Sequence, residues 1–298
     1  MSIVTIVIPT YNRIRAFEAV WPSYIGHPDV ARIVVVDDGS TDGTSEVIAR
    51  LAAAAPIPVE LIRHEEQRGQ PASRLTGIAA ADTEWVLFGE DDVWLSADYC
   101  ATLLREAEAL GASVIAGRVV TARVPGDFSP DGLSDPVTRQ DEKSELFDLS
   151  SMDADFSARP PRPVRAPFLH SIALIRRTVF DDVSFDRWYT GNSWREETDF
   201  YLGANATGAV VYFTPNAVCY HLRGPLCSTG GQRVNRLRFE YLAWRNTRYL
   251  VSKHWEYLKR AHGFRGSVNG WMVKYYARRQ MAQLRRAITS GARSTYRG

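Results

Sequence analysis

The sequence has few cysteines, no long apolar run and no secretory-type start, and each absence excludes a class of protein. Its three Cys are irregularly placed and form no zinc-type spacing, so a reducing, cytoplasmic setting is expected. No stretch reaches the roughly 18 apolar residues that span a bilayer. The first eight residues lack a basic region and a small-residue cleavage site, so we expect no signal peptide.

The net charge of +2 hides an uneven distribution along the chain. Residues 232–298 contain 16 Lys and Arg but 2 Asp and Glu, a balance of +14. Residues 1–231 contain the other 20 basic and 32 acidic residues, a balance of −12. The chain is thus an acidic body with a basic tail. Such a tail indicates an anionic partner, which could be phosphates, an acidic membrane surface or the body itself.

Apolar runs alternate with helix-compatible segments through the first 120 residues. The predicted strands are residues 3–8, 31–36, 59–62, 85–88 and 113–120. The predicted helices are residues 14–24, 44–55, 71–81 and 97–110. Strands that alternate with helices of roughly 10–14 residues predict an α/β fold, in which helices flank a mostly parallel, Rossmann-like central sheet.

The pattern is less regular after residue 120. Residues 125–167 are rich in Pro, Asp, Ser and Arg, which predicts an irregular excursion. It either shapes a binding cleft or is a surface loop without function. Strand character returns at 168–175 and 209–213, and the chain beyond Val234 is expected to be helical. The chain accordingly divides into residues 1–120, residues 121–231 and a C-terminal helical extension of residues 232–298.

Three consecutive carboxylates, Glu90-Asp91-Asp92, directly follow the apolar run 85–88. They are expected at the carboxyl edge of the sheet, where open α/β folds bind ligands. Three like charges repel one another unless a cation or solvent neutralises them. Mg²⁺ and Mn²⁺ suit such oxygen ligands and usually bind through one or two carboxylates plus substrate phosphates. The turn therefore predicts a metal–nucleotide site, and a solvated acidic turn is the alternative.

Other segments carry side chains that suit a nucleotide. Tyr11, just after the first strand, could stack on a base. Asp38, at the end of the second strand, could accept the ring N–H of uracil or a ribose hydroxyl. Arg74, in the predicted helix 71–81, could clamp phosphate oxygens bidentately, although such an Arg is also typical of a surface ion pair.

In this order, the segments resemble the family 2 glycosyltransferases of the GT-A fold. The resemblance runs from residue 3 to about residue 222 and is carried by residues 7–13, 34–42, 69–74 and 90–92. It implies a nucleotide-sugar-binding half over 1–120 and an acceptor-binding, catalytic half over 121–231. The implied nucleotide contacts are Pro9, Thr10, Tyr11, Asn12, Asp38, Arg74, Glu90 and Asp91. The implied ligands of a Mn²⁺ or Mg²⁺ cofactor are Asp92 and, at a later strand end, His221.

The segment 194–200 carries the catalytic part of the resemblance. It is similar to the family's Glu-Asp motif, whose second acid is the general base in inverting members. That acid takes the acceptor's proton while the acceptor attacks the anomeric carbon. The position is Glu197 here, and Glu196 and Asp199 are further candidates. The residues alone also fit an acidic helix N-terminus favoured by the helix dipole.

The resemblance implies a metal-dependent, inverting transfer of one sugar from a UDP- or dTDP-sugar to an acceptor hydroxyl or amine. The Gln-x-x-Arg-Trp motif and membrane helices of processive members are missing from the sequence, so one transfer per encounter is expected. A retaining GT-A transferase or a sugar nucleotidyltransferase could use the same metal and sheet. A non-catalytic nucleotide-sugar-binding protein of this fold is a further alternative.

The sequence leaves three kinds of acceptor open: a small molecule, a glycan or a lipid-linked compound. The basic tail could make peripheral contact with the anionic inner face of a membrane. It could instead pack on the acidic body or form a homodimer, with its Trp and Tyr as ordinary core, and we prefer this version. Its arginines scatter among apolar residues, which argues against nucleic acid. The run Gly230-Gly231-Gln232-Arg233 predicts a flap near the diphosphate.

Overall fold

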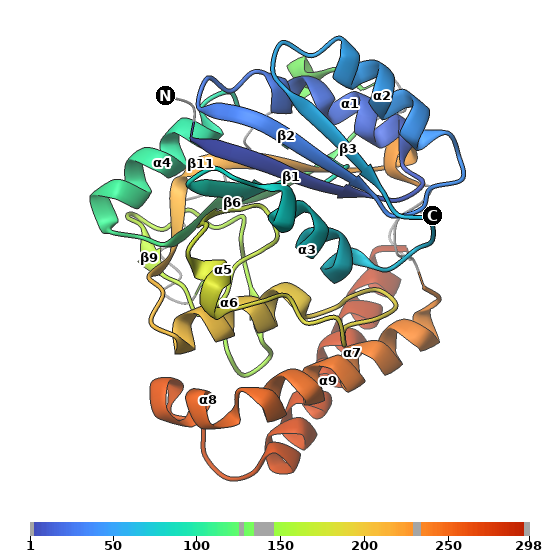
Figure 1. The fold of residues 1–298 in the computed structure, drawn as a ribbon. Helices are drawn as coiled ribbons and strands as arrows, with labels where there is room; N and C mark the ends of the chain where they lie inside the picture. The colour runs from blue at the N-terminus through green and yellow to red at the C-terminus, as the bar shows by residue number, and fades with distance from the viewer. Residues whose placement is uncertain (1–2, 125–127, 134–145, 229–233, 295–298) are drawn as a thin grey trace.

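The computed structural model describes residues 3–124, 128–133, 146–228 and 234–294, with side chains up to residue 281 in the last segment (Figure 1). The predicted flap at 230–233 lies outside the described residues, and so does part of the excursion at 125–167. Among the described residues, no helix combines the length and the apolar character needed to cross a bilayer.

A nine-stranded sheet forms the centre of the fold, in the order β3-β2-β1-β4-β10-β6-β11-β5, with β9 beside β11. Its strands are β1 (Val4–Thr10), β2 (Val30–Asp37), β3 (Val59–Arg63), β4 (Trp85–Phe88), β5 (Val93–Leu95), β6 (Val114–Arg123), β9 (Val164–Arg165), β10 (Ala173–Arg176) and β11 (Val211–Arg223). Strands β1, β2, β3, β4, β6 and β11 run in one direction, and β5, β9 and β10 run against them. The prediction of a mostly parallel sheet is confirmed.

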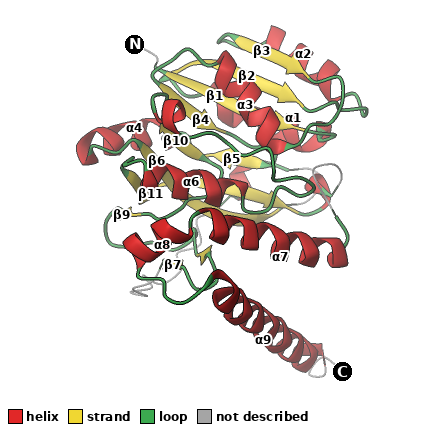
Figure 2. Ribbon diagram, turned by 60° about the horizontal axis from the view of Figure 1, so that its bottom comes forward, coloured by secondary structure: helices red, strands yellow, loops and turns green. Residues whose placement is uncertain are grey.

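Helices cover both faces of this sheet (Figures 1 and 2). They are α1 (Ile14–Ile25), α2 (Thr44–Ala53), α3 (Gln70–Ala80), α4 (Tyr99–Leu110), α5 (Val179–Asp182), α6 (Glu196–Ala206), α7 (Arg236–Lys253), α8 (Trp255–His262) and α9 (Val268–Ser294). Ile6 and Ile8 of β1 pack in one core with residues of α1, α2 and α4. Val7 packs in the other core with residues of α3, α6, α7 and α8. Alternate side chains of one buried strand thus enter opposite cores, as the pleat requires.

One small two-stranded sheet and two short turns complete the described elements. Strands β7 (Phe147–Asp148) and β8 (Asp153–Ala154) form a separate two-stranded sheet within the predicted excursion. Short 3₁₀ turns lie at η1 (Pro130–Gly132) and η2 (Pro225–Cys227). The described part of the excursion is therefore irregular, as predicted, and carries only short strands.

The predicted elements of residues 1–120 are confirmed to within three residues at either end, except that β5 was not predicted. The strand predicted at 168–175 is largely wrong, because regular pairing starts only at Ala173. The strand predicted to end at Phe213 continues to Arg223. Its pairing with β6 shifts register between Phe213 and Val218, around Pro215. A proline, which has no N–H to donate, is tolerated at such a bulge.

The C-terminal helices are helical as predicted, but their aromatic residues divide into two groups. Tyr275 is buried and Trp271 packs against the core below the sheet. Tyr241 and Trp244 of α7 are 60% and 42% exposed. The preferred version placed these aromatics against the body or in a homodimer contact. The first group packs on the body, whereas the second group is exposed on this chain.

Candidate active site

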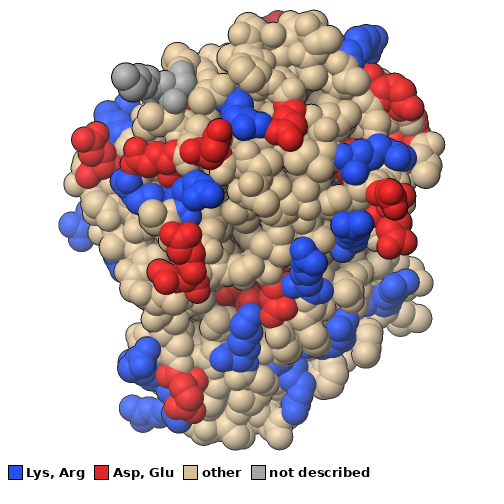
Figure 3. Space-filling view, viewed as in Figure 1, with Lys and Arg blue, Asp and Glu red and all other residues tan. Residues whose placement is uncertain are grey.

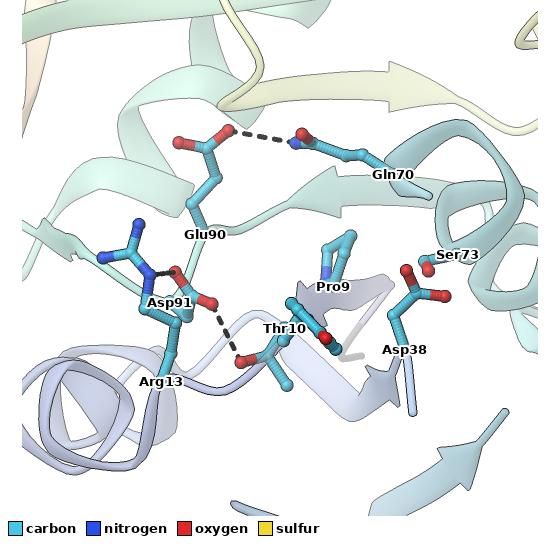
Figure 4. A pocket seen from close by; sticks show the side chains of 9 residues that line it. Pro9, Thr10, Arg13, Asp38, Gln70, Ser73, Glu90 and Asp91 are labelled. Carbon is cyan, nitrogen blue, oxygen red and sulfur yellow. Dashed lines mark hydrogen bonds and ion pairs between the residues drawn. The ribbon is translucent and has the colours of Figure 1, made fainter. Parts of the chain in front are cut away.

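A pocket lies where neighbouring parallel strands β2, β1 and β4 end (Figure 4). Its lining is Pro9, Thr10, Tyr11, Arg13, Asp38, Gln70, Ser73, Glu90 and Asp91. Six of the eight predicted nucleotide contacts are therefore brought together, all except Asn12 and Arg74. Arg13, Gln70 and Ser73 were not predicted, although each lies inside a segment that the sequence singled out.

The carboxylate of Asp38 is buried and held by three nitrogens. Its Oδ2 accepts from the backbone N–H of Gly69 at 2.8 Å, and its Oδ1 accepts from that of Arg68 at 2.9 Å. Nδ1 of His64 lies 2.8 Å from the same Oδ1, and Nε2 of His64 lies 3.0 Å from the hydroxyl of Thr76. A carboxylate offers about four acceptor positions. Three are occupied, so one remains for a ligand.

The loop after β2 is fixed by local contacts that exclude Asn12 from the pocket. The backbone N–H of Asn12 donates to the hydroxyl of Ser40 at 2.9 Å, and its side-chain oxygen accepts from Thr41 N–H at 2.8 Å. Gly39 has a φ of +81°, and a Cβ there would lie 2.9 Å from the carbonyl carbon of Glu66. Asn12 therefore shapes the loop that presents Asp38 rather than lining the cavity.

The acidic turn is fixed from behind by helix α1. The hydroxyl of Tyr24 accepts from the backbone N–H of Glu90 at 3.0 Å and donates to its carbonyl oxygen at 2.9 Å. In front, the hydroxyl of Thr10 donates to Asp91 Oδ2 at 2.8 Å. The guanidinium of Arg13 lies 3.3 Å from Asp92 Oδ2 and 4.0 Å from Asp91 Oδ1. The turn is thus held in place and partly neutralised.

The two aspartates of the turn differ in their electrostatics. Burial raises the pKa of Asp91 to about 7, with a further contribution from the charge of Asp92, and Arg13 and Thr10 oppose this shift. Burial would also raise the pKa of Asp92, but the hydrogen bond and charge of His221, together with Arg13, lower it overall. Asp92 is therefore the better anion of the pair.

Asp92 and His221 are the residues that fit a divalent cation. Pairing of β11 with β5 places His221 opposite Val93, and its Nε2 lies 3.5 Å from Asp92 Oδ2. A carboxylate oxygen and an imidazole nitrogen this close together could both serve as ligands of one Mn²⁺ or Mg²⁺ ion. Within the described ranges, no group of three or more His, Cys, Asp and Glu residues could hold a metal by itself. A site of this kind depends on ligand phosphates.

Arg74 occupies a different place from the predicted one. Its side chain is fully buried and is not among the described residues that line the pocket. Its Nε lies 3.0 Å from Glu196 Oε1, and its Nη2 lies 3.4 Å from Glu197 Oε1 and 3.7 Å from Glu90 Oε1. The rings of Phe88 and Phe185 lie over the same guanidinium. Arg74 thus binds three carboxylates of this chain, and the structure does not place it among the residues open to a phosphate.

The two glutamates beside Arg74 differ in access. The side chain of Glu196 is 1% exposed and that of Glu197 is 26% exposed. Burial raises the pKa of Glu196 to about 8, although the charge of Arg74 opposes the shift. The pKa of Glu197 is also raised, first by burial and again against the charge of Arg74. Glu197 is the glutamate that a ligand could reach, with a raised affinity for protons.

The third acid of this segment, Asp199, faces away from the pocket. Its oxygens lie 2.7 Å from Lys253 Nζ and 2.9 Å from His254 Nε2, at the end of α7. Lys253 also contacts Asp186 at 2.9 Å. Asp199 therefore anchors α6 to α7, which does not favour its prediction as a reserve base.

Comparison with known proteins decides the family. Residues 5–184, more than half of the chain, match the family model described as glycosyl transferase family 2. The chain belongs to this family. The matched range includes the strands that frame the pocket and the acidic turn, and it ends before the glutamates of α6.

Related proteins agree with this assignment. The pre-mycofactocin glycosyltransferase of Mycobacterium tuberculosis is 29% identical over 221 residues, which is 73% of this chain and 42% of that protein. An uncharacterized glycosyltransferase of Nostoc is 38% identical over 94 residues, 30% of this chain and 29% of that one. The chain thus spans less than half the length of these relatives.

Solved structures show the same fold. The crystal structure of S. aureus TarS 1–349 has a TM-score of 0.58 at 14% identity, covering 92% of this chain and 70% of that one. Its complex with UDP-GlcNAc has a TM-score of 0.56 at 15% identity, covering 83% and 66%. The predicted GT-A fold is confirmed.

A second cavity adjoins the pocket of this family 2 chain and shares Glu90 with it. Its lining is Glu90, Val93, Val119, Thr121, Asp155, Phe156, Ser157, His170, Ser171, Ile172 and His221. Phe156 packs edge-on against His170, with the ring centroids 4.9 Å apart. Among the described residues, the wall combines an aromatic ring with hydroxyl, imidazole and carboxylate groups and includes no Lys or Arg. It was not predicted, because its residues come from five separate parts of the sequence.

Proposed function

We propose that this protein transfers one sugar from a nucleotide-diphosphate donor to an acceptor hydroxyl or amine, with inversion at the anomeric carbon. The observation that carries the proposal is the meeting of two acidic groups at one sheet edge in a family 2 chain. Asp91 and Asp92 lie at the pocket, and Glu197 lies in the neighbouring cluster. Glu90 joins them, because it lines the pocket and also contacts the Arg74 that binds Glu197.

In this proposal Asp38 recognises the base of the donor. Its single remaining acceptor position suits the one ring N–H that uracil or thymine offers. Its other positions are held by two backbone N–H groups and by the ring of His64, so the carboxylate is already oriented before a ligand binds. The TarS structures with UDP and UDP-GlcNAc, although they share only the fold, support a uridine donor.

Asp92 and His221 would hold Mn²⁺ or Mg²⁺, and Asp92 is the residue held as the anion. When bound, such an ion supplies positive charge to the leaving diphosphate. Arg13 contacts the same carboxylate oxygen. We propose that its guanidinium turns toward the donor phosphates when the ion occupies Asp92.

Glu197 is proposed as the general base. It is reachable from solvent, whereas Glu196 is sealed behind Arg74. Burial raises the pKa of Glu197, which strengthens it as a proton acceptor near neutral pH. Arg74 limits that rise, so Glu197 can still be ionised when the acceptor arrives.

The second cavity is the proposed acceptor site. It meets the donor pocket at Glu90, as an in-line displacement between donor and acceptor requires. Phe156 offers an apolar surface for one face of a sugar ring, and the hydroxyl and carboxylate groups around it can hydrogen-bond to hydroxyls. The part of this lining that the structure describes carries no Lys or Arg, which favours an uncharged, hydroxyl-bearing acceptor group over a phosphate-bearing one.

The test is a thermal-shift panel of UDP-, dTDP- and GDP-sugars with and without Mn²⁺. We expect the uridine or thymidine donors to raise the unfolding temperature and Mn²⁺ to enlarge the shift. Asp38→Ala should remove the preference over GDP-sugars, while the exposed control Asp82→Ala should keep it. The proposal fails if no nucleotide sugar stabilises the protein. An α-linked product from an α-linked donor, seen by NMR, would indicate a retaining enzyme, and pyrophosphate release would indicate a nucleotidyltransferase.

A further inference from the structure

The C-terminal helices carry an exposed apolar surface. All six large apolar side chains that are exposed in the described part of the chain lie on α7 or α9. They are Leu237, Tyr241, Trp244, Val273, Tyr276 and Met281, between 42% and 84% exposed. Scattered exposed apolar residues are common, but a group confined to two adjacent helices marks an interaction surface.

The spacing of these residues makes one continuous face, which we call the α7–α9 face. Leu237, Tyr241 and Trp244 follow one another at steps of four and three, so they lie on one side of α7. Two shallow grooves between the helices are both lined by Trp244 and Tyr276, which joins the two stripes. Arg279 of α9 contacts both carboxylate oxygens of Glu240 on α7, at 2.9 and 3.0 Å, and holds the helices together.

The surroundings of this face are strongly cationic. Residues 234–281 contain eleven Lys and Arg but two acids, a difference of nine positive charges. Both acids are engaged within the extension, Glu240 by Arg279 and Glu256 by Lys259. Arg236, Arg238 and Arg248 are exposed on α7 next to the apolar stripe. Figure 3 shows Lys and Arg spread over the lower part of the molecule, where these helices lie.

We propose that the α7–α9 face binds the surface of an anionic phospholipid bilayer, with its aromatic side chains at the level of the lipid headgroups. Helices with Trp, Tyr and Leu on one side and Arg or Lys beside them lie in this interface. Trp and Tyr, each with an apolar body and a polar end, favour headgroup depth. Arginine guanidinium groups next to them meet lipid phosphates.

A second copy of the chain fits this face less well. A two-fold contact would bring the same patch of both copies together, and with it the exposed Arg236, Arg238 and Arg248 of each copy. Like charges at a contact repel, whereas an anionic bilayer neutralises them. The bilayer is therefore the occupant that satisfies both the apolar side chains and the charge.

The test is co-sedimentation of the full chain with phosphatidylcholine vesicles and with mixed phosphatidylcholine–phosphatidylglycerol vesicles. We expect at least tenfold stronger binding to the anionic vesicles, and a marked fall in binding when NaCl is raised from about 0.05 M to about 0.5 M. Replacing Arg236 and Arg238 by Gln should weaken binding by roughly tenfold or more, because each arginine near the surface contributes about 1 kcal/mol. The matched control replaces the exposed Arg105 and Arg162, outside the extension, by Gln and should bind as before.

A second variant pair tests the apolar contribution. Leu237→Ser and Val273→Ser change side chains that are 84% and 71% exposed, so folding should be unaffected, as circular dichroism would verify. We expect the pair to weaken vesicle binding by roughly tenfold or more. Equal binding to both vesicle types, or none, would overturn the proposal. If light scattering shows a dimer, and Leu237→Ser dissociates it, the face is instead the contact between two copies of the chain. These measurements of vesicle binding do not depend on the proposed sugar transfer, because the vesicles contain no sugar nucleotide.

Discussion

This protein has two groups of carboxylates, a pair of aspartates and a pair of glutamates, that lie in different surroundings. Asp91 and Asp92 line or adjoin an open pocket, beside Arg13 and His221, and Asp92 is held as an anion. Glu196 and Glu197 lie around the buried Arg74, and both have raised pKa values. Carboxylates kept charged suit the binding of cations and phosphates, whereas carboxylates with raised pKa suit proton transfer. Within one turn the pKa of Asp91 is raised to about 7 and that of its neighbour Asp92 is lowered, so the surroundings rather than the residue type set the charge of each carboxylate.

The largest effect should come from the proton-transfer group. Glu197→Gln should lower kcat by about 10²- to 10⁴-fold, because Gln cannot accept the acceptor's proton. The affinity for the donor should stay unchanged in a calorimetric titration. The matched control is Glu46→Gln, an exposed first-turn glutamate of α2, which should keep full activity. Full turnover by the Glu197 variant would show that another group is the base.

The cation-binding group should respond differently. Asp92→Asn should lower sugar transfer on the order of 10²- to 10³-fold, because a charge that stabilises the leaving group through its ion is lost. Unlike the Glu197 variant, it should also lose the Mn²⁺-dependent part of donor binding. Chelation with EDTA should reproduce this loss in the native protein, and Mn²⁺ should restore activity. If sugar transfer is undiminished in EDTA, the proposed role of a divalent cation is wrong.

The pH dependence of activity in Arg74 variants tests how this side chain controls the pKa of Glu197. Because Glu197 must be ionised to act as a base, kcat/KM should rise with pH through an apparent pKa above the ordinary value of Glu, 4.5. The charge of Arg74 lowers that pKa, so Arg74→Met should move the rise to higher pH by roughly one unit or more. It should also lower the free energy of unfolding by about 3–5 kcal/mol, because buried carboxylates lose their partner. Arg74→Lys keeps the charge and should preserve most of the profile, and an unchanged profile in Arg74→Met would contradict the coupling.

Asp199 should give the smallest change in activity. It lies two residues from Glu197, but it contacts Lys253 and His254. Asp199→Asn should lower the free energy of unfolding by about 1–3 kcal/mol, the effect of weakened buried hydrogen bonds. Transfer, measured with folded protein below its unfolding temperature, should stay within about threefold. A loss as large as that of Glu197→Gln would place Asp199 in the proton-transfer group.

The first half of the fold was predictable because its signals are local. Three of the four strands of residues 1–88, all but β3, are short β-branched or apolar runs that meet Pro, Asp or Gly at their ends, and parallel strands bring such ends to one edge. Asp38, Asp91 and Tyr11 therefore reached one pocket as expected. β5 was missed because three residues carry no periodicity that can be recognised.

The second half depends on contacts between distant residues. Arg74 meets Glu196 across 122 positions of sequence, so no local pattern indicates that the guanidinium is already bound. The strand predicted over residues 209–213 stopped short of Pro215, whereas a bulge carries β11 past this proline and places His221 beside Asp92. Exposure could not be predicted either: Trp244 and Trp271 are the same residue type in the same basic extension, and only one packs on the core.

The burial of Arg74 also limits how the chain can be divided. The guanidinium belongs to α3, but Glu196, Glu197 and one of its two ring partners, Phe185, come from beyond residue 180. A truncated protein that ended near residue 120 would keep a cation in apolar surroundings without these neighbours. Fragments for expression should therefore extend past α6, and the two halves of the fold are better treated as one cooperative unit than as separable modules.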